Sequence, residues 1–211
     1  MPSPDRLTTF QRRLIEAFFS LPDAAGYVLA GGAGLLAAGI STRPTDDVDL
    51  FGVDLDQGVV PAANSFEARC VEHGWTVRTL HDSPTFRRIE IRDRDDAVLV
   101  DIAIDTPPIL AVHHTEVAPT FAPREMAARK VLALFDRAAA RDFADLHTLA
   151  DQFDMNDLLA LAAELDAGFD LTAFGVMLRS ITRFTDEELA ATGSDPGTLR
   201  HFAADLASRL R

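Results

Sequence analysis

The sequence predicts an α+β fold, with a mixed β-sheet in the first half of the chain and helices alone in the second. Between residues 27 and 104, short runs of β-favouring residues alternate with helix-forming stretches and glycine turns. Beyond the proline break at residues 106–108, the chain becomes alanine-rich and its apolar residues recur at helical spacing. We therefore expect an α/β domain over residues 1–108 and a helical domain over residues 109–211.

The composition is that of an ordinary globular protein and excludes several classes. Of the 211 residues, 47% are hydrophobic and 25% are charged, and no apolar stretch approaches the roughly 20 residues that span a bilayer. Cys70, the single cysteine, excludes an internal disulfide and a cysteine-based zinc site, and we expect it to be buried in a helix. The start of the chain lacks a secretory-signal pattern, so we expect a cytoplasmic protein without membrane contact. The formal net charge of −13 argues against non-specific nucleic-acid binding.

An amphipathic helix is predicted over residues 7–20, with Thr8 or Thr9 as its cap. Its apolar side chains recur at helical spacing and are expected to pack in the core: Leu7, Phe10, Leu14 and Phe18. A short apolar strand over residues 27–30 follows this helix.

Gly31 and Gly32 come directly after this strand and before a short helix predicted over residues 34–38. Two glycines before a helix let a phosphate approach the backbone N–H groups at its positive end. A polar loop then leads to a second strand that carries Asp47 and Asp49. Side chains alternate along a strand, so these carboxylates share one face, where their repulsion favours a bound cation. A phosphate site beside a metal site indicates chemistry on a nucleoside triphosphate.

The rest of the predicted sheet follows a helix over residues 59–74. The side chains expected on the buried side of this helix are Phe66, Cys70 and Val71. Three β-like runs come next, over residues 75–80, 85–92 and 97–104, and a turn at residues 93–96 joins the last two as a hairpin. The third run is almost wholly apolar, which predicts a central strand. Asp101 interrupts it, and a carboxylate in a central strand needs a partner or a metal.

The second half of the chain is predicted to be helical after a connecting segment over residues 109–123. A long helical pattern covers residues 124–153. Further helices, each beginning at a capping residue, are predicted over residues 156–168, 170–181, 185–192 and 194–210. Thr185 and Glu188 have the spacing of a capping box.

Two motifs, taken in order, resemble one family of enzymes. Gly-Gly followed by RPTDDVDLF, with a later aspartate inside a strand, resembles the nucleotidyltransferase superfamily typified by DNA polymerase beta. The pattern R-x-T-x-D-x-D-L at residues 43–50, with KVLALFDRAAARDFADLHTL at residues 130–149, is similar to AbiEii/AbiGii-type toxins, which include the mycobacterial MenT toxins. The resemblance covers about residues 27–149.

The resemblance implies a nucleotidyltransferase fold for the N-terminal domain and a toxin of a type IV toxin–antitoxin pair. Such enzymes transfer a nucleotide from a nucleoside triphosphate, and in the MenT branch the acceptor is the 3′ end of tRNA. The expected partners are therefore a nucleoside triphosphate, tRNA and a separate antitoxin protein, and we expect the chain to be monomeric.

The resemblance also implies roles for the residues of the first motif. Asp47 and Asp49 would bind Mg²⁺, or Mn²⁺ in its place, and Asp101 would complete the site and orient or deprotonate the acceptor hydroxyl. Two metals about 3.5–4 Å apart would hold the triphosphate for in-line attack. Gly31 and Gly32 would cradle its phosphates. A solvated strand end and a plain tight turn are the simpler interpretations of these residues.

The second motif supplies Lys130, which would contact the triphosphate. Arg141 would join it if the helix between them is continuous. Asp142 and Asp145 are three residues apart and share a helix face, so either would position Lys130 or Arg141, and the sequence does not choose between them. A charged, solvated helix face is the simpler alternative.

The arginines of the N-terminal half have less specific roles. In the loop before the aspartate pair, Thr45 would fix the backbone and Arg43 would touch phosphate or solvent. Four strand arginines form either a local RNA-facing patch or ordinary solvated positions: Arg78, Arg87, Arg88 and Arg92.

The sequence is compatible with three functions. The first is an Mg²⁺-dependent transfer of a nucleotide to tRNA by a toxin. The second keeps this chemistry with a different acceptor, either a small molecule such as an aminoglycoside or a protein hydroxyl, and the acidic charge favours a cationic acceptor. The third is a catalytically silent interaction module, against which three intact aspartates argue.

Overall fold

The computed structural model describes residues 7–53 and 58–210, and it separates into two compact units, Met1–Pro123 and Arg124–Arg211. The first unit contains a mixed sheet with flanking helices and the second contains helices, as the sequence predicted. The units divide later in the chain than the predicted boundary after residue 108, because the segment that follows it still pairs with the sheet.

The first unit is built on a seven-stranded sheet with the order β3-β4-β5-β2-β1-β7-β6 in the described residues. Its strands are β1 (Tyr27–Ala30), β2 (Asp47–Val53), β3 (Thr76–Asp82), β4 (Phe86–Asp93), β5 (Asp96–Asp105), β6 (His113–His114) and β7 (Pro119–Thr120). β2 pairs with β5 in parallel, as β1 does with β7, and the other neighbours are antiparallel. The sheet is therefore mixed, and β5 is an internal strand, which confirms the prediction from its apolar run.

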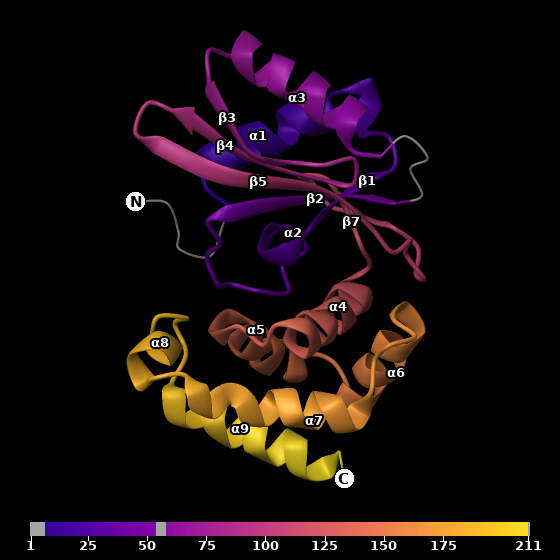
Figure 1. Cartoon of the computed structure of the whole chain (residues 1–211), viewed down its shortest axis with the longest axis vertical. Coiled ribbons are helices and arrows are strands. Elements are labelled where there is room, and N and C mark those ends of the chain that lie inside the picture. The colour runs from indigo at the N-terminus through magenta and orange to yellow at the C-terminus, as the bar shows by residue number, and fades with distance from the viewer. Residues whose placement is uncertain (1–6, 54–57, 211) are drawn as a thin grey trace. The chain divides into compact units, whose positions relative to one another are not determined.

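Helices α1 (Thr9–Phe19) and α3 (Val60–Glu72) cover one face of the sheet (Figure 1). Thr8 caps α1 through a capping box with Gln11. The core between these helices and the sheet is aromatic and aliphatic, because the strands turn their apolar side chains toward it. Its members include Phe10, Leu14, Phe18, Phe66, Leu50, Val100 and Ile102.

Cys70 is fully buried on α3, as predicted. Burial, with a smaller contribution from the charge of Glu67, raises the pKa of the thiol to about 12. The prediction that Val71 is buried was wrong, because its side chain is 64% exposed. Phe66 and Cys70 are one helical turn apart on the buried side, whereas Val71 is rotated by about 100° from Cys70, toward solvent.

Helix α2 (Gly31–Ala37) follows β1 without a connecting turn and lies on the other face of the sheet from α1 and α3 (Figure 1). The sequence placed its first turn at residue 34, but the helix begins at Gly31. Gly31 has φ +58°, a conformation that glycine adopts without the steric cost of a Cβ atom. The glycine pair therefore belongs to the first turn of the helix.

Strands β6 and β7 lie in the segment that the sequence treated as a connection over residues 109–123. Each is two residues long, so neither leaves a periodic pattern. Leu29 of β1 is the register partner of Thr120, and this pairing attaches the segment to the sheet.

The second unit consists of helices connected by short segments. They are α4 (Pro123–Asp136), α5 (Ala140–Ala150), α6 (Met155–Leu165), α7 (Leu171–Arg179), η2 (Ser180–Arg183), α8 (Asp186–Ala190) and α9 (Pro196–Arg209). α9 packs against α7, α5 and α8. Side chains cap α6, α7, α8 and α9, and the predicted capping box of Thr185 and Glu188 is present.

The continuous helical pattern predicted over residues 124–153 is interrupted between α4 and α5. Ala138 has φ +44°, a left-handed conformation that ends the first helix. The alanine run around this position has no glycine or proline to mark the break. Arg141 therefore belongs to a different helix from Lys130.

Candidate active site

Strand β2 places Asp47 and Asp49 on one face of the sheet, which we call the carboxylate face. The intervening Val48 and the following Leu50 are 1% and 0% exposed and belong to the core. This alternation is the one predicted from the sequence. The parallel pairing with β5 puts Asp49 directly opposite Asp101, so a third carboxylate occupies the same face.

Asp101 is 8% exposed and has a strong partner on the next strand. Arg88 of β4 is opposite Asp101, and its Nε and Nη2 donate to Oδ1 and Oδ2 at 2.7 and 2.5 Å. The Asp101 hydrogen bond raises the pKa of the Arg88 guanidinium above its ordinary value, burial lowers it, and the negative charges of all three carboxylates raise it further. Arg88 is therefore the counter-ion of Asp101.

The two glycines make room for side chains of the motif itself. A Cβ on Gly31 would lie 1.7 Å from Oδ2 of Asp49, and a Cβ on Gly32 would lie 2.7 Å from Oγ1 of Thr45. Neither position admits a larger residue without displacement of a neighbour. The sequence assigned both glycines to phosphate contact, and it gave no sign of this close approach to Asp49 and Thr45.

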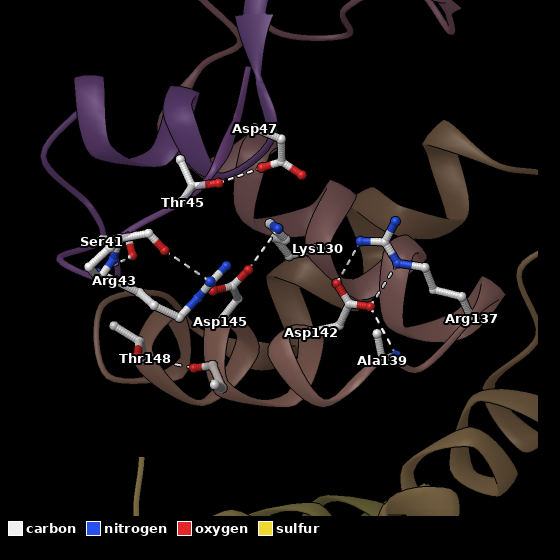
Figure 2. A network of polar contacts seen from close by, with 12 residues as sticks. Ser41, Arg43, Thr45, Asp47, Lys130, Arg137, Ala139, Asp142, Asp145 and Thr148 are labelled. Carbon is white, nitrogen blue, oxygen red and sulfur yellow. Dashed lines mark hydrogen bonds and ion pairs between the residues drawn. The ribbon is translucent and has the colours of Figure 1, made fainter. Parts of the chain in front are cut away.

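Thr45 lies in the loop before β2 (Figure 2). The bond of its hydroxyl is to a carboxylate side chain, whereas the sequence predicted a bond to the backbone. The Thr45 hydroxyl donates to Oδ1 of Asp47 at 2.5 Å, and the Thr45 carbonyl accepts from Nε2 of Gln11 at 2.7 Å. Gln11 is 2% exposed, so this bond joins α1 to the loop inside the unit. Arg43, in the same loop, is half-buried, and its Nη1 donates to the carbonyl of Pro44.

Lys130 and Asp145 form a buried ion pair within the helical unit (Figure 2). The Nζ atom of Lys130 on α4 is 2.7 Å from Oδ2 of Asp145 on α5, with 11% and 1% of the two side chains exposed. The pair ties the two helices together and fixes the direction of the ammonium group.

Asp142 has different partners from Asp145, although the two share a helix. Its carboxylate is 0% exposed and accepts from Nε and Nη2 of Arg137, both at 2.9 Å, and from the backbone N–H of Ala139 at 3.0 Å (Figure 2). These bonds hold the break between α4 and α5. Arg137 is a residue that the sequence did not single out, while Arg141 is exposed on the first turn of α5.

The chemistry of the three carboxylates suits a divalent cation, which prefers oxygen ligands. In the described part of the chain, however, no three acidic, histidine or cysteine side chains are grouped closely enough to hold a metal as they stand. Oxygens of two of the carboxylates have protein partners in this structure, since Asp47 accepts from Thr45 and both oxygens of Asp101 accept from Arg88. The three aspartates fit a metal in two respects: their carboxylates supply oxygen ligands, and the strand register places them on one face of the sheet.

The strand arginines do not form one basic patch. Arg87 is on the opposite face from Arg88 and is buried, with hydrogen bonds to Asp82 and Asn64 at 2.8 and 2.6 Å. On the carboxylate face, Arg78 and Arg92 are both ion-paired with the same acidic residue, Glu90. Each of the four strand arginines is therefore paired with an acidic side chain.

A mixed sheet with an Asp-x-Asp strand beside a strand that carries a third aspartate is the arrangement of the nucleotidyltransferase class. The chain belongs to the AbiEii family of nucleotidyl transferase toxins of type IV toxin–antitoxin systems, whose family model matches residues 13–208. A comparison with curated protein sequences found no match.

Solved structures share this fold over nearly the whole chain. A Helicobacter pylori protein is 18% identical with a TM-score of 0.62, covering 97% of this chain and 96% of its own. JHP933 from Helicobacter pylori is 16% identical with a TM-score of 0.55, covering 94% and 89%. MenT4, a nucleotidyltransferase toxin from Mycobacterium tuberculosis H37Rv, is 14% identical with a TM-score of 0.52, covering 97% and 89%.

The family match establishes a nucleotidyltransferase that uses a nucleoside triphosphate. The same match identifies it as the toxin of a type IV toxin–antitoxin system. No helix in residues 7–53 or 58–210 is long and apolar enough to cross a membrane.

Proposed function

We propose that this toxin transfers a nucleoside monophosphate from a nucleoside triphosphate to the 3′ end of a tRNA, with Mg²⁺ as its metal. The observation that carries the proposal is the register of β2 and β5. It sets Asp49 opposite Asp101, with Asp47 on the same face, so that three carboxylates share one surface. Such a group is costly to hold together unless it binds cations.

The reaction forms one phosphorus–oxygen bond and breaks another. The 3′-hydroxyl oxygen of the acceptor attacks the α-phosphorus, the bond from that phosphorus to the α,β-bridging oxygen breaks, and pyrophosphate leaves. Asp101 orients the hydroxyl and accepts its proton, which then passes to solvent. Asp47 and Asp49 would hold Mg²⁺, or Mn²⁺ in its place, with Asp101 as a third ligand. The metal would supply charge stabilisation for the triphosphate.

Lys130 is the proposed cationic contact for the triphosphate, and Asp145 is its positioning residue because the two form an ion pair. Asp142 has its bonds satisfied by Arg137 and Ala139, which suits a structural role. We propose Asp145, and not Asp142, as the functional carboxylate of the second motif.

Other residues keep the roles that the family resemblance implies. Gly31 and Gly32 would admit the phosphates beside the carboxylates, Thr45 would hold the loop, and Arg43 and Arg141 are further candidates for phosphate contact. The partner of the toxin would be a separate antitoxin protein, as its family implies.

The test supplies purified protein with Mg²⁺, each α-labelled nucleoside triphosphate in turn, and total tRNA. Label in the tRNA, confined to its 3′ end, is the expected result, and it also names the base. Label on the toxin itself, or on an added protein, with none in tRNA, would contradict the proposed acceptor.

The net charge of −13 favours one alternative acceptor, a small cationic molecule such as an aminoglycoside. The same assay with an aminoglycoside in place of tRNA separates the two candidates. Transfer to the small molecule alone would establish this alternative.

A further inference from the structure

A cluster of two aromatic rings and one guanidinium lies beside Asp101, on the side away from Asp47 and Asp49, with His81 and Arg88 exposed and Phe86 half-buried. Its members are His81, Phe86 and Arg88, and we call them the His81 cluster. The rings of His81 and Phe86 have centroids 5.4 Å apart, and the Arg88 guanidinium is 5.7 Å from the Phe86 centroid. The cluster is continuous with Asp101 through the two hydrogen bonds from Arg88.

The strands fix the position of the cluster on the carboxylate face. His81 of β3 is opposite Arg88 of β4, and Phe86 is two residues before Arg88, so all three side chains share that face with Asp101. The order across the sheet is β2, β5, β4 and β3, and these strands are drawn side by side in Figure 1. Asp101 therefore stands between the Asp-x-Asp pair and the cluster.

This order has a consequence for the transfer reaction. The attacking oxygen and the leaving pyrophosphate lie on opposite sides of the α-phosphorus in an in-line displacement. With the triphosphate at Asp47 and Asp49 and the acceptor hydroxyl at Asp101, the rest of the acceptor extends toward β4 and β3. The first side chains that it meets there are those of the His81 cluster.

The chemistry of the cluster matches a nucleotide. Aromatic side chains stack on unpaired bases, and this contact tolerates any base. Arg88 uses Nε and Nη2 for Asp101, and its Nη1 makes no hydrogen bond to the residues that the structure describes. Nη1 is thus a donor available to a phosphate oxygen, a bond that Arg forms well.

We propose that the His81 cluster is the acceptor subsite and that it takes the terminal, unpaired nucleotide of an RNA 3′ end. A base stacks on Phe86 and His81, the adjoining phosphate accepts from Arg88, and the 3′-hydroxyl reaches Asp101. This inference rests on the proposed transfer to RNA. A small acceptor without an aromatic base would leave the two rings without a stacking partner.

The experiment compares variants of the full-length toxin with a matched control. Phe86→Ala and His81→Ala remove the rings, while Phe86→Trp keeps a stacking surface. Arg92→Gln is the control, since it removes an exposed arginine from the same face of β4 that is paired with Glu90 instead. The measurements are binding of a fluorescent single-stranded RNA with a free 3′-hydroxyl, KM for tRNA, and the thermal shift caused by nucleoside triphosphate with Mg²⁺.

Phe86→Ala is expected to weaken RNA binding and raise KM for tRNA by about 10-fold to 100-fold, the contribution of one stacked base. His81→Ala is expected to show a smaller loss in the same direction. Phe86→Trp and Arg92→Gln should bind RNA like the wild type, and every variant should keep the thermal shift caused by the nucleotide.

The outcomes that overturn the subsite are distinct from failure of the proposed function. If the wild-type toxin labels tRNA and both Phe86→Ala and His81→Ala bind RNA as well as the wild type does, the subsite alone is overturned. Loss of RNA binding and of the nucleotide-induced shift together would indicate a structural role and would also overturn it. A wild type that binds nucleotide but labels no RNA would overturn both inferences. His81 is exposed, so its variant tests the subsite even if Phe86→Ala folds poorly.

Discussion

Arg88 occupies both oxygens of Asp101, so a divalent cation must compete with it for this carboxylate. Removal of the guanidinium leaves three carboxylates with less compensation. We therefore predict that Arg88→Gln binds Mg²⁺ and Mn²⁺ more tightly. The side chain is 46% exposed, so the gain is modest, roughly 3-fold to 10-fold. Calorimetric titration of Mn²⁺ into the nucleotide-free protein measures it.

Arg88→Lys is the matched variant because it keeps the positive charge without the two-pronged bond. Its metal affinity should lie between those of the wild type and Arg88→Gln. An Arg88→Gln protein that binds Mn²⁺ with wild-type or weaker affinity would show that Arg88 does not compete with the metal.

For the individual residues of the site, the sequence predicted the residue types but not their hydrogen-bond partners. Alternation along one strand was enough to put Asp47 and Asp49 on one face. The pairing of Asp101 with Arg88 depends on the register between two strands, which no local pattern contains. The close approach of Asp49 to Gly31 likewise depends on how α2 follows β1 and was invisible in the sequence.

Among the elements, the break between α4 and α5 depends on Asp142. Its carboxylate is fully buried and accepts from Arg137 and from the N–H of Ala139. Asp142→Ala removes these bonds, and we expect it to lower the free energy of unfolding by about 2 kcal/mol, since half-exposed Arg137 can still be solvated. Urea unfolding followed by circular dichroism measures this loss.

Asp145→Asn is the comparison for this prediction. It keeps the shape of the side chain while it weakens the pair with Lys130, so nucleotide-dependent transfer should fall even where the fold is retained. Equal stability of Asp142→Ala and the wild type would contradict the structural role of Asp142. Full activity of Asp145→Asn would contradict the positioning role of Asp145.

Element prediction succeeded where a pattern extends over several residues and failed where it does not. The first helix, the strands of the hairpin and the capping box at Thr185 all followed from local spacing. Strands β6 and β7 were missed because pairing with β1, not their own two-residue sequence, defines them. The break at Ala138 was missed because alanine has high helix propensity.

For the whole molecule, the two motifs fall on two compact units. The carboxylates belong to Met1–Pro123, while Lys130 and Asp145 belong to Arg124–Arg211. The sequence predicted this division into sheet and helices, and the family match over residues 13–208 extends beyond the stretch that carried the resemblance. A chain with a net charge of −13 is poorly suited to bind a long stretch of RNA through a basic groove. Recognition of a single terminal nucleotide, as proposed above, needs few phosphate contacts.

Asp49→Asn tests most directly whether the carboxylate face is the transfer centre. This change removes one charge and keeps the size of the side chain beside Gly31. Asp46→Asn is the control, because Asp46 is exposed in the loop before β2. We predict that Asp49→Asn lowers label transfer from nucleoside triphosphate to tRNA by roughly 100-fold or more, as for other preorganised charges in active sites. Asp46→Asn should transfer like the wild type. Full transfer by a folded Asp49→Asn protein would show that the carboxylate face is not the transfer centre.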